Sequence, residues 1–391
     1  MKSLHRRDFL RCAACATAAV ALPTPIRAWT RARPRADRRT LVLLHLEGGN
    51  DGLNTVIPYA DPRYAALRPG LARRGAEVLK LDGKVGLHSN LEGLKSLFES
   101  DRAAILLGVG YPAPDLSHFR ATEIWHSAEP DRSPSQGWIG RALDATPREL
   151  PLRAVSIGAE PPLVLSALTT PTTTVQSFSR FRVPDALASI DALYDRCASA
   201  PGTLGAAGRA GAAAVRAARK IATLTPSARD YGQAGELGST LRKVAALAAS
   251  DESPEVIACA FGGFDTHASQ RGTHDQLLRQ LGAGLAAFDA DVRERGVDDR
   301  VLVVVYSEFG RRPAENASGG TDHGTACPIF VVGKRVRKNL YGEQPPLDDL
   351  DAGNLRHAVD FRRVYASLLK DWLGVDPRPV VGAFDPLPFL A

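Results

Sequence analysis

The chain has 391 residues, 44% of them hydrophobic and 24% charged, a composition that excludes a disordered chain and a coiled coil. This length is enough for a large hydrophobic core, and five cysteines are too few for a small disulfide-stabilised fold. A formal net charge of +6 suggests, at first sight, nucleic acid or an anionic membrane as a partner.

Residues 1–28 have the features of an export signal. The stretch from Arg6 to Leu10, RRDFL, resembles the twin-arginine motif that sends folded proteins across the bacterial inner membrane. The apolar run that follows, from Cys12 to Leu22, is too short to span a bilayer but has the length of a signal-peptide core. We therefore expect removal near Ala28, the twin-arginine export machinery as a partner, and a periplasmic or secreted product. The alternative is an amphipathic first helix.

Removal of this signal changes the charge balance. Residues 29–39 form an arginine-rich linker, and residues 40–391 contain 39 basic and 41 acidic residues, a net charge of −2. The basic excess therefore lies outside the expected folded domain, so we expect no nucleic-acid partner and no stable membrane span. The three cysteines beyond the signal are expected to be small buried residues: Cys197, Cys259 and Cys327.

The hydrophobic pattern predicts an α/β fold with a mainly parallel central sheet flanked by helices. Short apolar runs typical of buried parallel strands occur at 40–46, 103–109, 153–157, 255–261, 301–306 and 328–332. Helical periodicity lies between them, at 91–99, 119–127, 278–295 and 361–373. Residues 185–250 are rich in Ala and Arg and show no strand pattern, which predicts a helical insertion in the 40–391 domain.

Polar clusters follow four of these predicted strands. After 40–46 comes EGGNDGLN, in which Asn50, Asp51 and Asn54 either line a crevice or form a simple turn. After 103–109 comes DLSHFR. Here Ser117 is either a helix N-cap or a nucleophile at a helix N-terminus, with His118 and Arg120 beside it as candidate substrate contacts.

The other two clusters carry carboxylates and imidazoles. After 255–261 comes FGGFDTH, where Asp265 and His267 are spaced to face one pocket or, alternatively, cap a helix. After 301–306 comes SEFGRR and then TDH, with Glu308, Arg311 and the Asp322-His323 pair. The alternatives there are a solvated arginine pair and a polar loop held by local hydrogen bonds.

Together these side chains predict a site for divalent cations. Carboxylate oxygens and imidazoles suit one or two ions of Zn²⁺, Mn²⁺, Ca²⁺ or Mg²⁺. Such ions could promote displacement at phosphorus while Arg311 binds the oxygens of a small anionic ester substrate. The predicted ligands are Asp51, Asp265, His267, Glu308, Asp322 and His323.

Long motifs then identify a family. LEGGNDGLNTVIPYADPRYAALRP, SHFRATEIW, GWIGR, FGGFDTHASQ and SEFGRRPAENASGGTDHGTACPIFVVG resemble the exported bacterial family known as domain of unknown function 1501. The similarity extends from Leu41 to the C-terminal helix. That family resembles the alkaline phosphatase and sulfatase superfamily, whose enzymes hold one or two divalent metals on strand-end Asp and His residues.

The resemblance implies roles for individual residues. Asp51 resembles the first-strand metal aspartate, Ser117 the nucleophile, and Asp265 with His267 the middle metal pair. Glu308 resembles the carboxylate of the later strand and His323 the last histidine. The chain departs from the superfamily in having Asp-x-His at the middle pair and Ser-Glu at the later strand, and its cysteines and Ser117 lack the formylglycine context of a sulfatase.

The sequence thus predicts an exported metal-dependent hydrolase or transferase acting on phosphate or related anionic esters. Ser117 and Arg311 are its predicted catalytic residues, and Asn50, Asn54, His118 and Arg120 its predicted substrate contacts. The alternative is a non-catalytic exported binding or assembly protein that retains the fold.

Overall fold

The computed structural model describes residues 38–148, 150, 152–181, 183–184 and 189–391. The predicted signal at 1–28 and most of the linker at 29–39 lie outside the described residues. Among the described helices, none is both long and apolar enough to cross a membrane.

The central strand is β1 (Thr40–Leu46), which is buried on both faces because its residues are almost all aliphatic. Val42, Leu44 and Leu46 belong to one hydrophobic core, and Leu41 and Leu43 to a second core on the opposite face. This alternation is the two-residue period of a strand, so β1 divides the molecule into two layers of helices.

The sheet has the order β11-β5-β10-β9-β1-β8-β6-β7, with β14 also paired to β5. Its long strands are β5 (Ala103–Gly110), β8 (Val256–Phe261), β9 (Val301–Tyr306) and β10 (Cys327–Val332). Its short strands are β6 (Ala154–Ile157), β7 (Thr172–Val175), β11 (Leu340–Tyr341) and β14 (Val359–Asp360). The β10 strand runs antiparallel to both β9 and β5, whereas the other pairs are parallel.

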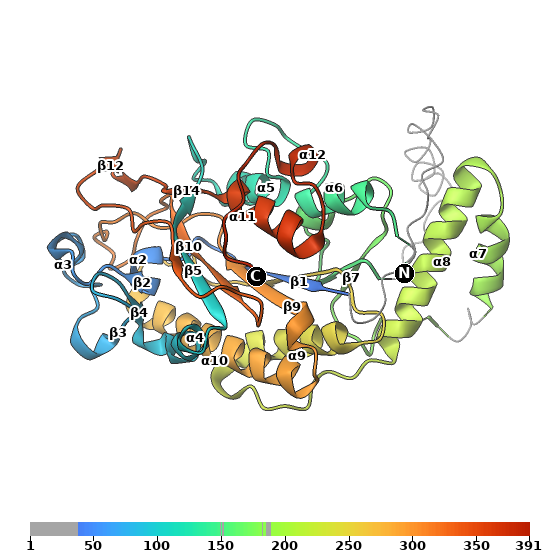
Figure 1. Ribbon diagram of the computed structural model, residues 1–391, viewed down its shortest axis with the longest axis horizontal. Helices are drawn as coiled ribbons and strands as arrows, with labels where there is room; N and C mark the ends of the chain where they lie inside the picture. Colours follow the sequence, from blue (N-terminus) through green and yellow to red (C-terminus); the bar gives the residue numbers. More distant parts are fainter. Residues whose placement is uncertain (1–37, 149, 151, 182, 185–188) are drawn as a thin grey trace, which may run out of the picture.

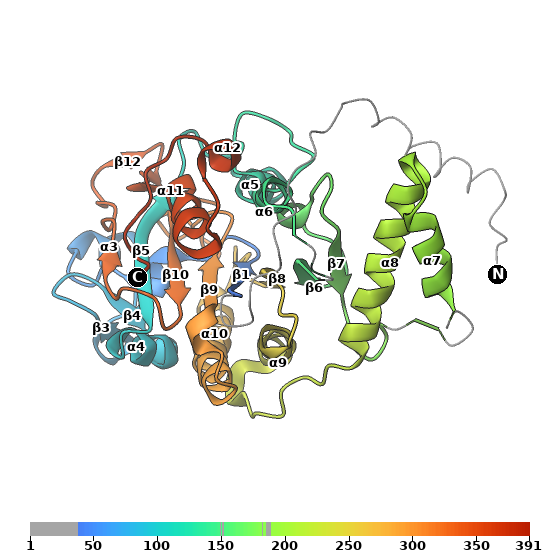
Figure 2. The same cartoon turned by 45° about the vertical axis from the view of Figure 1, so that its right-hand side comes forward.

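Helices cover both faces of this sheet (Figure 1). On one face lie α5 (His118–Ser127), α6 (Trp138–Ala145), α11 (Phe361–Ser367, continued by a π-helical turn at Leu368–Leu373) and α12 (Arg378–Val381). On the other face lie α4 (Glu92–Glu99), α9 (Gly235–Ala249) and α10 (Gln270–Glu294). The helices α7 (Ile190–Ala198) and α8 (Gly202–Ala222) pack against each other beyond the β7 edge (Figure 2).

Small elements cover the opposite edge. A three-stranded sheet is formed by β2 (Val56–Ile57), β3 (Val78–Lys80) and β4 (Gly86–His88), next to the short helices α2 (Gly52–Thr55) and α3 (Pro62–Leu67). The strands β12 (Leu350–Asp351) and β13 (Asn354–Leu355) form a separate hairpin.

These observations confirm the predicted α/β fold with a mainly parallel sheet and flanking helices. Within 185–250 the described residues form α7, α8 and α9 and no strand, and α9 lies beside α10 rather than with the α7–α8 pair. The domain boundaries themselves stay predictions. The cysteines Cys197, Cys259 and Cys327 are free thiols. Cys259 and Cys327 are buried as expected, whereas the expectation is wrong for Cys197, which is partly exposed on α7.

The direction of β10 brings the predicted polar clusters to one edge. Because β1, β5, β8 and β9 are parallel, their carboxyl ends meet at the same side of the sheet. The antiparallel β10 starts at that side, so the whole connection 307–326 begins and ends there. Residues far apart in the sequence are thereby placed around one point.

Candidate metal centre

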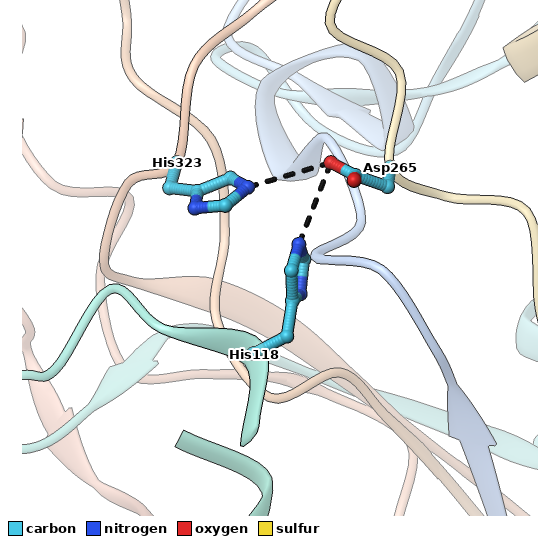
Figure 3. Close-up of side chains that lie close together, drawn as sticks. All are labelled: His118, Asp265 and His323. Atoms are coloured by element: carbon cyan, nitrogen blue, oxygen red, sulfur yellow. Dashed lines mark hydrogen bonds and ion pairs between the residues drawn. The ribbon is translucent and has the colours of Figure 1, made fainter. Parts of the chain in front are cut away.

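Four side chains meet above the carboxyl edge of the sheet. His118 is the first residue of α5, Asp265 and His267 follow β8, and His323 lies in the connection between β9 and β10. Figure 3 shows His118 and His323 pointing at the carboxylate of Asp265 from two sides. We call His118, Asp265, His267 and His323 the metal-site cluster.

One carboxylate oxygen is the centre of this cluster. Asp265 Oδ1 lies 3.0 Å from His267 Nε2, 3.4 Å from His323 Nε2 and 3.5 Å from His118 Nε2. The Nε2 atoms of His267 and His323 are 2.9 Å apart. The three imidazoles therefore present the same ring nitrogen to one small volume.

The other nitrogen of each ring is held by an acceptor. His118 Nδ1 lies 2.7 Å from Glu308 Oε1, and His323 Nδ1 lies 2.8 Å from the carbonyl oxygen of Leu116. His267 Nδ1 lies 3.4 Å from Asp322 Oδ1. Because a carboxylate or a carbonyl can only accept, these contacts assign the ring proton to Nδ1 in each neutral imidazole.

His267 Nε2 also lies 3.3 Å from Arg311 Nη1, which can donate to it. The Nε2 lone pairs of His118 and His323 face the carboxylate of Asp265, an arrangement that a bound cation would stabilise. His118 Nε2 is buried without a hydrogen-bond partner among the described residues. One ligand atom from each of His118, Asp265 and His323 falls within 4.8 Å of the others. Ligand atoms around a tetrahedral Zn²⁺ lie about 3.4 Å apart, and Nδ1 hydrogen bonds of this kind are typical of metal-binding histidines. The residues present thus fit a metal ion.

Glu308 contacts His118 of the metal-site cluster and is only 2% exposed. Its carboxylate accepts from His118, from His45 Nε2 at 3.1 Å, from the backbone N–H of Gly48 at 2.9 Å and from the Ser307 hydroxyl at 3.0 Å. Burial raises the pKa of Glu308, but the hydrogen bonds and charge of His45, with the bond from His118, outweigh it and lower the pKa to about 2. Glu308 is therefore a buried anion that orients His118.

Arg311 holds the loops of the site together. Its Nε donates to the carbonyl of Gly49 at 2.7 Å and its Nη1 to that of Thr321 at 2.8 Å. Its Nη2 donates to the carbonyl of Gly48 and to Asp265 Oδ1, the latter at 2.6 Å. Burial raises the pKa of Asp265, but the hydrogen bond and charge of Arg311, together with the charges of His118 and His267, outweigh burial. The pKa of Asp265 is therefore lowered, and its carboxylate is ionised at neutral pH.

The close approach of two loops requires glycine at position 48. Gly48 has φ +114°, and a Cβ placed there would lie 2.4 Å from the backbone nitrogen of Asp265. The double glycine after β1 therefore lets the β1 and β8 loops touch, which brings Asp265 within reach of Arg311.

Comparison with protein families identifies the chain at this point. A family described as "Protein of unknown function (DUF1501)" matches residues 107–389, most of the chain and three of the four loops of the site. The chain belongs to this family. A comparison with curated proteins gives no match.

The DUF1501 protein is also similar to solved structures at very low sequence identity. One is the C-terminal periplasmic domain of EcEptC from Escherichia coli in complex with Zn, with 12% identity, 76% of this chain and 73% of that chain covered, and a TM-score of 0.36. A second is a protein in the alkaline phosphatase superfamily from Vibrio parahaemolyticus, with 10% identity, 88% and 72% covered, and a TM-score of 0.36. A third is the soluble domain of lipooligosaccharide phosphoethanolamine transferase A from Neisseria meningitidis, with 8% identity, 78% and 79% covered, and a TM-score of 0.35.

The first-strand carboxylate of the DUF1501 protein lies outside the metal-site cluster. Asp51 is fully buried, and both of its oxygens accept from Arg68 Nη1, at 2.6 and 2.8 Å. It also caps α2 and accepts from Gln270. Burial raises the pKa of Asp51, but the charges of Arg68 and His274 and the hydrogen bonds from Arg68 and Gln270 together outweigh burial and lower the pKa. The structure thus places Asp51 in a buried ion pair.

The two neighbouring asparagines are buried in the same network. Asn50 Oδ1 accepts from Thr55 at 3.1 Å and lies 3.0 Å from His274 Nε2. Asn54 Oδ1 accepts from Tyr64 at 2.7 Å and from Arg68 at 3.0 Å. Both side chains are 1% exposed, so the structure places them in the interior beneath the site.

The residues around His118 differ from one another in exposure. Ser117 is exposed and occupies the N-cap position of α5, but its side chain makes no capping hydrogen bond. Arg120 is directed to Glu123 at 2.7 Å and to the carbonyl of Pro130 at 2.6 Å. Asp322 is exposed and orients His267, as described above.

Sequence reasoning missed some members of the site. His45 was assigned no role, although a lone imidazole in the aliphatic run of β1 is a signal of a buried polar contact. His118 was expected to contact substrate, whereas the structure places its Nε2 in the metal-site cluster. The carbonyl of Leu116 had no signal in the sequence, because backbone acceptors depend on the path of the chain.

Proposed function

We propose that this protein is a metal-dependent hydrolase or transferase that acts on phosphate or related anionic esters. The observation that carries the proposal is the convergence of three imidazole Nε2 atoms on Asp265 Oδ1, with Nδ1 of each ring held by an acceptor. The guanidinium of Arg311 already contacts Asp265 Oδ1 at 2.6 Å and His267 Nε2 at 3.3 Å, whereas His118 Nε2 has no partner among the described residues, so a bound metal ion would complete the site.

The donor set favours a transition metal over Ca²⁺ or Mg²⁺. Three imidazoles and one carboxylate suit Zn²⁺ or Mn²⁺, since the harder alkaline-earth ions take oxygen ligands. When bound, the ion would act as a Lewis acid on a phosphoryl oxygen and lower the pKa of a hydroxyl group beside it. We assign the ligands as His118, Asp265, His267 and His323, with Glu308 and Asp322 holding two of the rings.

Ser117 is the proposed nucleophile. It is exposed, directly precedes His118, and its hydroxyl is not used to cap α5. Its Oγ would form a bond to phosphorus while the bond to the ester oxygen breaks, and the hydroxyl proton would leave with the departing alcohol. The positive end of the α5 dipole favours the negative charge that develops there.

The positive charge for the substrate is assigned to Arg312 rather than to Arg311. The N–H groups of Arg311 already donate to carbonyls and to Asp265. Arg312 is half-buried, and its backbone N–H donates to the carbonyl of Asp322 at 3.0 Å. The hydrogen bond of Asn316 and the hydrogen bond and charge of His267 lower the pKa of Asp322, and the charge of Arg312 contributes after them. Arg311 is then a positioning residue.

Export completes the proposal. The N-terminal RRDFL motif supports passage through the twin-arginine machinery, a route that would deliver the folded domain to the periplasm or the medium.

One observation favours the alternative of a non-catalytic binding protein. Asp51 is neutralised by Arg68 and Arg311 is saturated, so two groups that the sequence analysis assigned to chemistry have other partners. A protein that keeps the fold but binds a ligand without turnover would show this pattern.

A reconstituted enzyme assay decides between the two. The purified protein is loaded with Zn²⁺ or Mn²⁺ and offered 4-nitrophenyl phosphate, bis(4-nitrophenyl) phosphate and 4-nitrophenyl sulfate. We expect turnover of a phosphate ester, and Ser117→Ala should lower kcat by at least about 10³-fold without changing metal content.

Ser199→Ala, an exposed serine after α7, is the matched control and should keep full activity. Absence of turnover with any metal would contradict the enzyme proposal and leave the binding protein. Turnover that survives in Ser117→Ala would remove Ser117 from the mechanism alone.

A further inference from the structure

A cavity of about 480 Å³ lies at the carboxyl ends of β6 and β8, and no residue of the metal-site cluster lines it. It arises from small side chains on the face of the sheet that α5 covers. His45 of β1 is paired in register with Ala260 of β8, and Ser156 of β6 with Ala258. Ala260 is exposed although β8 is an interior strand with a neighbour on each side. Interior strands are normally covered on both faces, so this part of the sheet has room for a ligand.

Two buried imidazoles line the cavity. His45 is 5% exposed and His126 of α5 is 7% exposed. His45 Nε2 lies 3.1 Å from Glu308 Oε2. His126 Nε2 lies 3.1 Å from the Tyr306 hydroxyl. Neither Nδ1 has a hydrogen-bond partner among the described residues, and neither is fully buried. The cavity therefore reaches polar atoms that the described part of the chain leaves unpaired.

Glu308 fixes the proton of His45. Because a carboxylate can only accept, the ring proton of the neutral imidazole lies on Nε2, and Nδ1 is then an acceptor. The ring is held in place by stacking on Tyr306, with 4.9 Å between centroids and an interplanar angle of 5°. His45 Nδ1 thus offers an oriented lone pair to an N–H or O–H donor in the cavity.

Two carboxylates without partners belong to the same lining. Glu47 and Glu160 are exposed, and neither makes a hydrogen bond or an ion pair with a described residue. Glu47 is two residues beyond His45 and its backbone N–H still pairs with β8, so the two side chains lie on one face within reach of one ligand. Apart from the histidines, the other charged side chain of this lining is Lys243 of α9, whose Nζ donates to the carbonyl of Gln176 at 3.1 Å. The carboxylates outnumber the ammonium group, so the cavity favours a cation.

The distances between these groups favour an organic cation over a metal ion. Among the described residues, three metal-ligating side chains come within 4.8 Å of one another only at the metal-site cluster. Glu47, Glu160 and His45 therefore do not form a site for one bare ion. An ammonium group on a carbon frame can extend between them, and Leu43 and Val164 give that frame an apolar surface.

We propose that this cavity binds a small organic ligand that carries a primary ammonium group on an apolar frame. The ammonium N–H groups would donate to the carboxylate of Glu47 and to His45 Nδ1, and Glu160 would add a second negative charge. Glu308 connects the cavity to the metal-site cluster, since one of its oxygens contacts His45 and the other His118. The proposal does not rest on the proposed function, because no step of catalysis enters it.

The binding site is tested with 2-phenylethylamine as the probe and with 2-phenylethanol as its neutral counterpart. Isothermal titration at neutral pH compares the two on the purified chain, with and without Zn²⁺. We expect the amine to bind at least about 10-fold more tightly than the alcohol, because hydrogen bonds between charged groups are the stronger ones. The affinity should be the same in both preparations, since no residue of the metal-site cluster lines the cavity.

Three results would overturn the proposal. The first is equal affinity for the amine and the alcohol, or no binding of either. The second is tighter binding of 3-phenylpropanoate than of the amine, which would show that Lys243 selects an anion. The third is amine binding that occurs only with Zn²⁺, which would place the amine on the metal ion.

Two variants locate the bound amine. Glu47→Gln keeps the shape of the side chain but removes its charge, and it should weaken amine binding by at least about 10-fold. Ala260→Leu keeps the charges but fills the cavity, and it should abolish binding. Glu236→Gln on α9 is the matched control, because Glu236 is exposed and does not line the cavity, so the affinity should stay unchanged. An unchanged affinity in a folded Glu47→Gln or Ala260→Leu variant would also overturn the proposal.

Discussion

At the scale of single residues, the site depends on how its buried charges are paired. Glu308 and Asp51 are both buried carboxylates at the ends of strands, but their partners differ. Glu308 accepts hydrogen bonds from two imidazoles, a backbone N–H and a hydroxyl. It has no Lys or Arg partner among these donors, and it orients the ring of His118. Asp51 is in contact with the guanidinium of Arg68, which balances its charge.

This pairing predicts that Asp51 stabilises the fold rather than binding metal. In Asp51→Asn the Arg68 guanidinium stays buried without its anion, so the free energy of unfolding should fall by about 3–5 kcal/mol. The loss should be the same in protein that has been stripped of metal, which urea denaturation with and without a chelator measures.

A folded Asp51→Asn variant should also keep its metal. An unchanged unfolding free energy together with a loss of bound metal would show that Asp51 is a ligand, as the superfamily resemblance implied.

The residue scale also shows where sequence reasoning reached its limit. The clusters after each strand could be located, because residue type and strand pattern are both local. The division of labour among Glu308, Asp51 and His118 could not, since it depends on which cation each carboxylate meets across the fold. Arg68 lies within the first motif of the family resemblance, but neither its residue type nor its spacing marked it as the partner of Asp51.

At the scale of elements, the antiparallel β10 is what assembles the site. The sequence predicted its strand at 328–332 but not its direction, which follows from pairing with β5 and β9. Had β10 been parallel, the connection from β9 would have crossed to the far edge and carried His323 away from Asp265. Strand existence was therefore predictable from apolar runs, whereas strand direction required the long-range pairing.

Close packing of α6 provides an element-scale prediction. A Cβ on Gly140 would lie 1.8 Å from the carbonyl oxygen of Ser166, so Gly140→Ala must push α6 away from the 163–167 segment. We expect a loss of more than about 2 kcal/mol in unfolding free energy.

Gly272→Ala in α10 is the matched control, because the Cβ there would meet nothing within 4 Å. It should stabilise the protein by up to about 1 kcal/mol through helix propensity. Thermal denaturation of both variants measures these changes. A Gly140→Ala variant as stable as the wild type would contradict the predicted clash.

At the scale of the whole molecule, the charge balance separates the signal region from the folded domain. The net charge of −2 over residues 40–391 could be read from the sequence once the first 39 residues were set aside. The architecture of a central sheet with helices on both faces was also predictable, because the alternation of strand and helix patterns is strong. The cavity at the carboxyl ends of β6 and β8 was not, since its walls come from several distant segments.

Two buried histidines predict how stability depends on pH. Burial is the main cause that lowers the pKa of His126 and His274, in each case to about 3. In the unfolded chain a histidine has a pKa of about 6.5, so below that pH the unfolded state binds protons that the native state does not. Stability is then complete above about pH 6.5 and falls on acidification by about 1.4 kcal/mol per pH unit for each histidine.

Urea denaturation between pH 6.5 and pH 4.5 measures this slope. His126→Gln should reduce it by about one proton per molecule relative to the wild type. A slope that is unchanged in the variant would show that His126 is charged in the native state.

The central claim is that the metal-site cluster binds a divalent transition metal, and anomalous diffraction from crystals soaked with Zn²⁺ tests it most directly. The account predicts a peak among the four residues of the metal-site cluster, together with tight binding of one Zn²⁺ per chain in titration. Glu308→Gln should weaken that binding by about 10–100-fold, since Glu308 holds the ligand ring of His118. The absence of an anomalous peak at the cluster would contradict this claim. So would a double variant, His118→Ala with His323→Ala, that binds Zn²⁺ as tightly as the wild type.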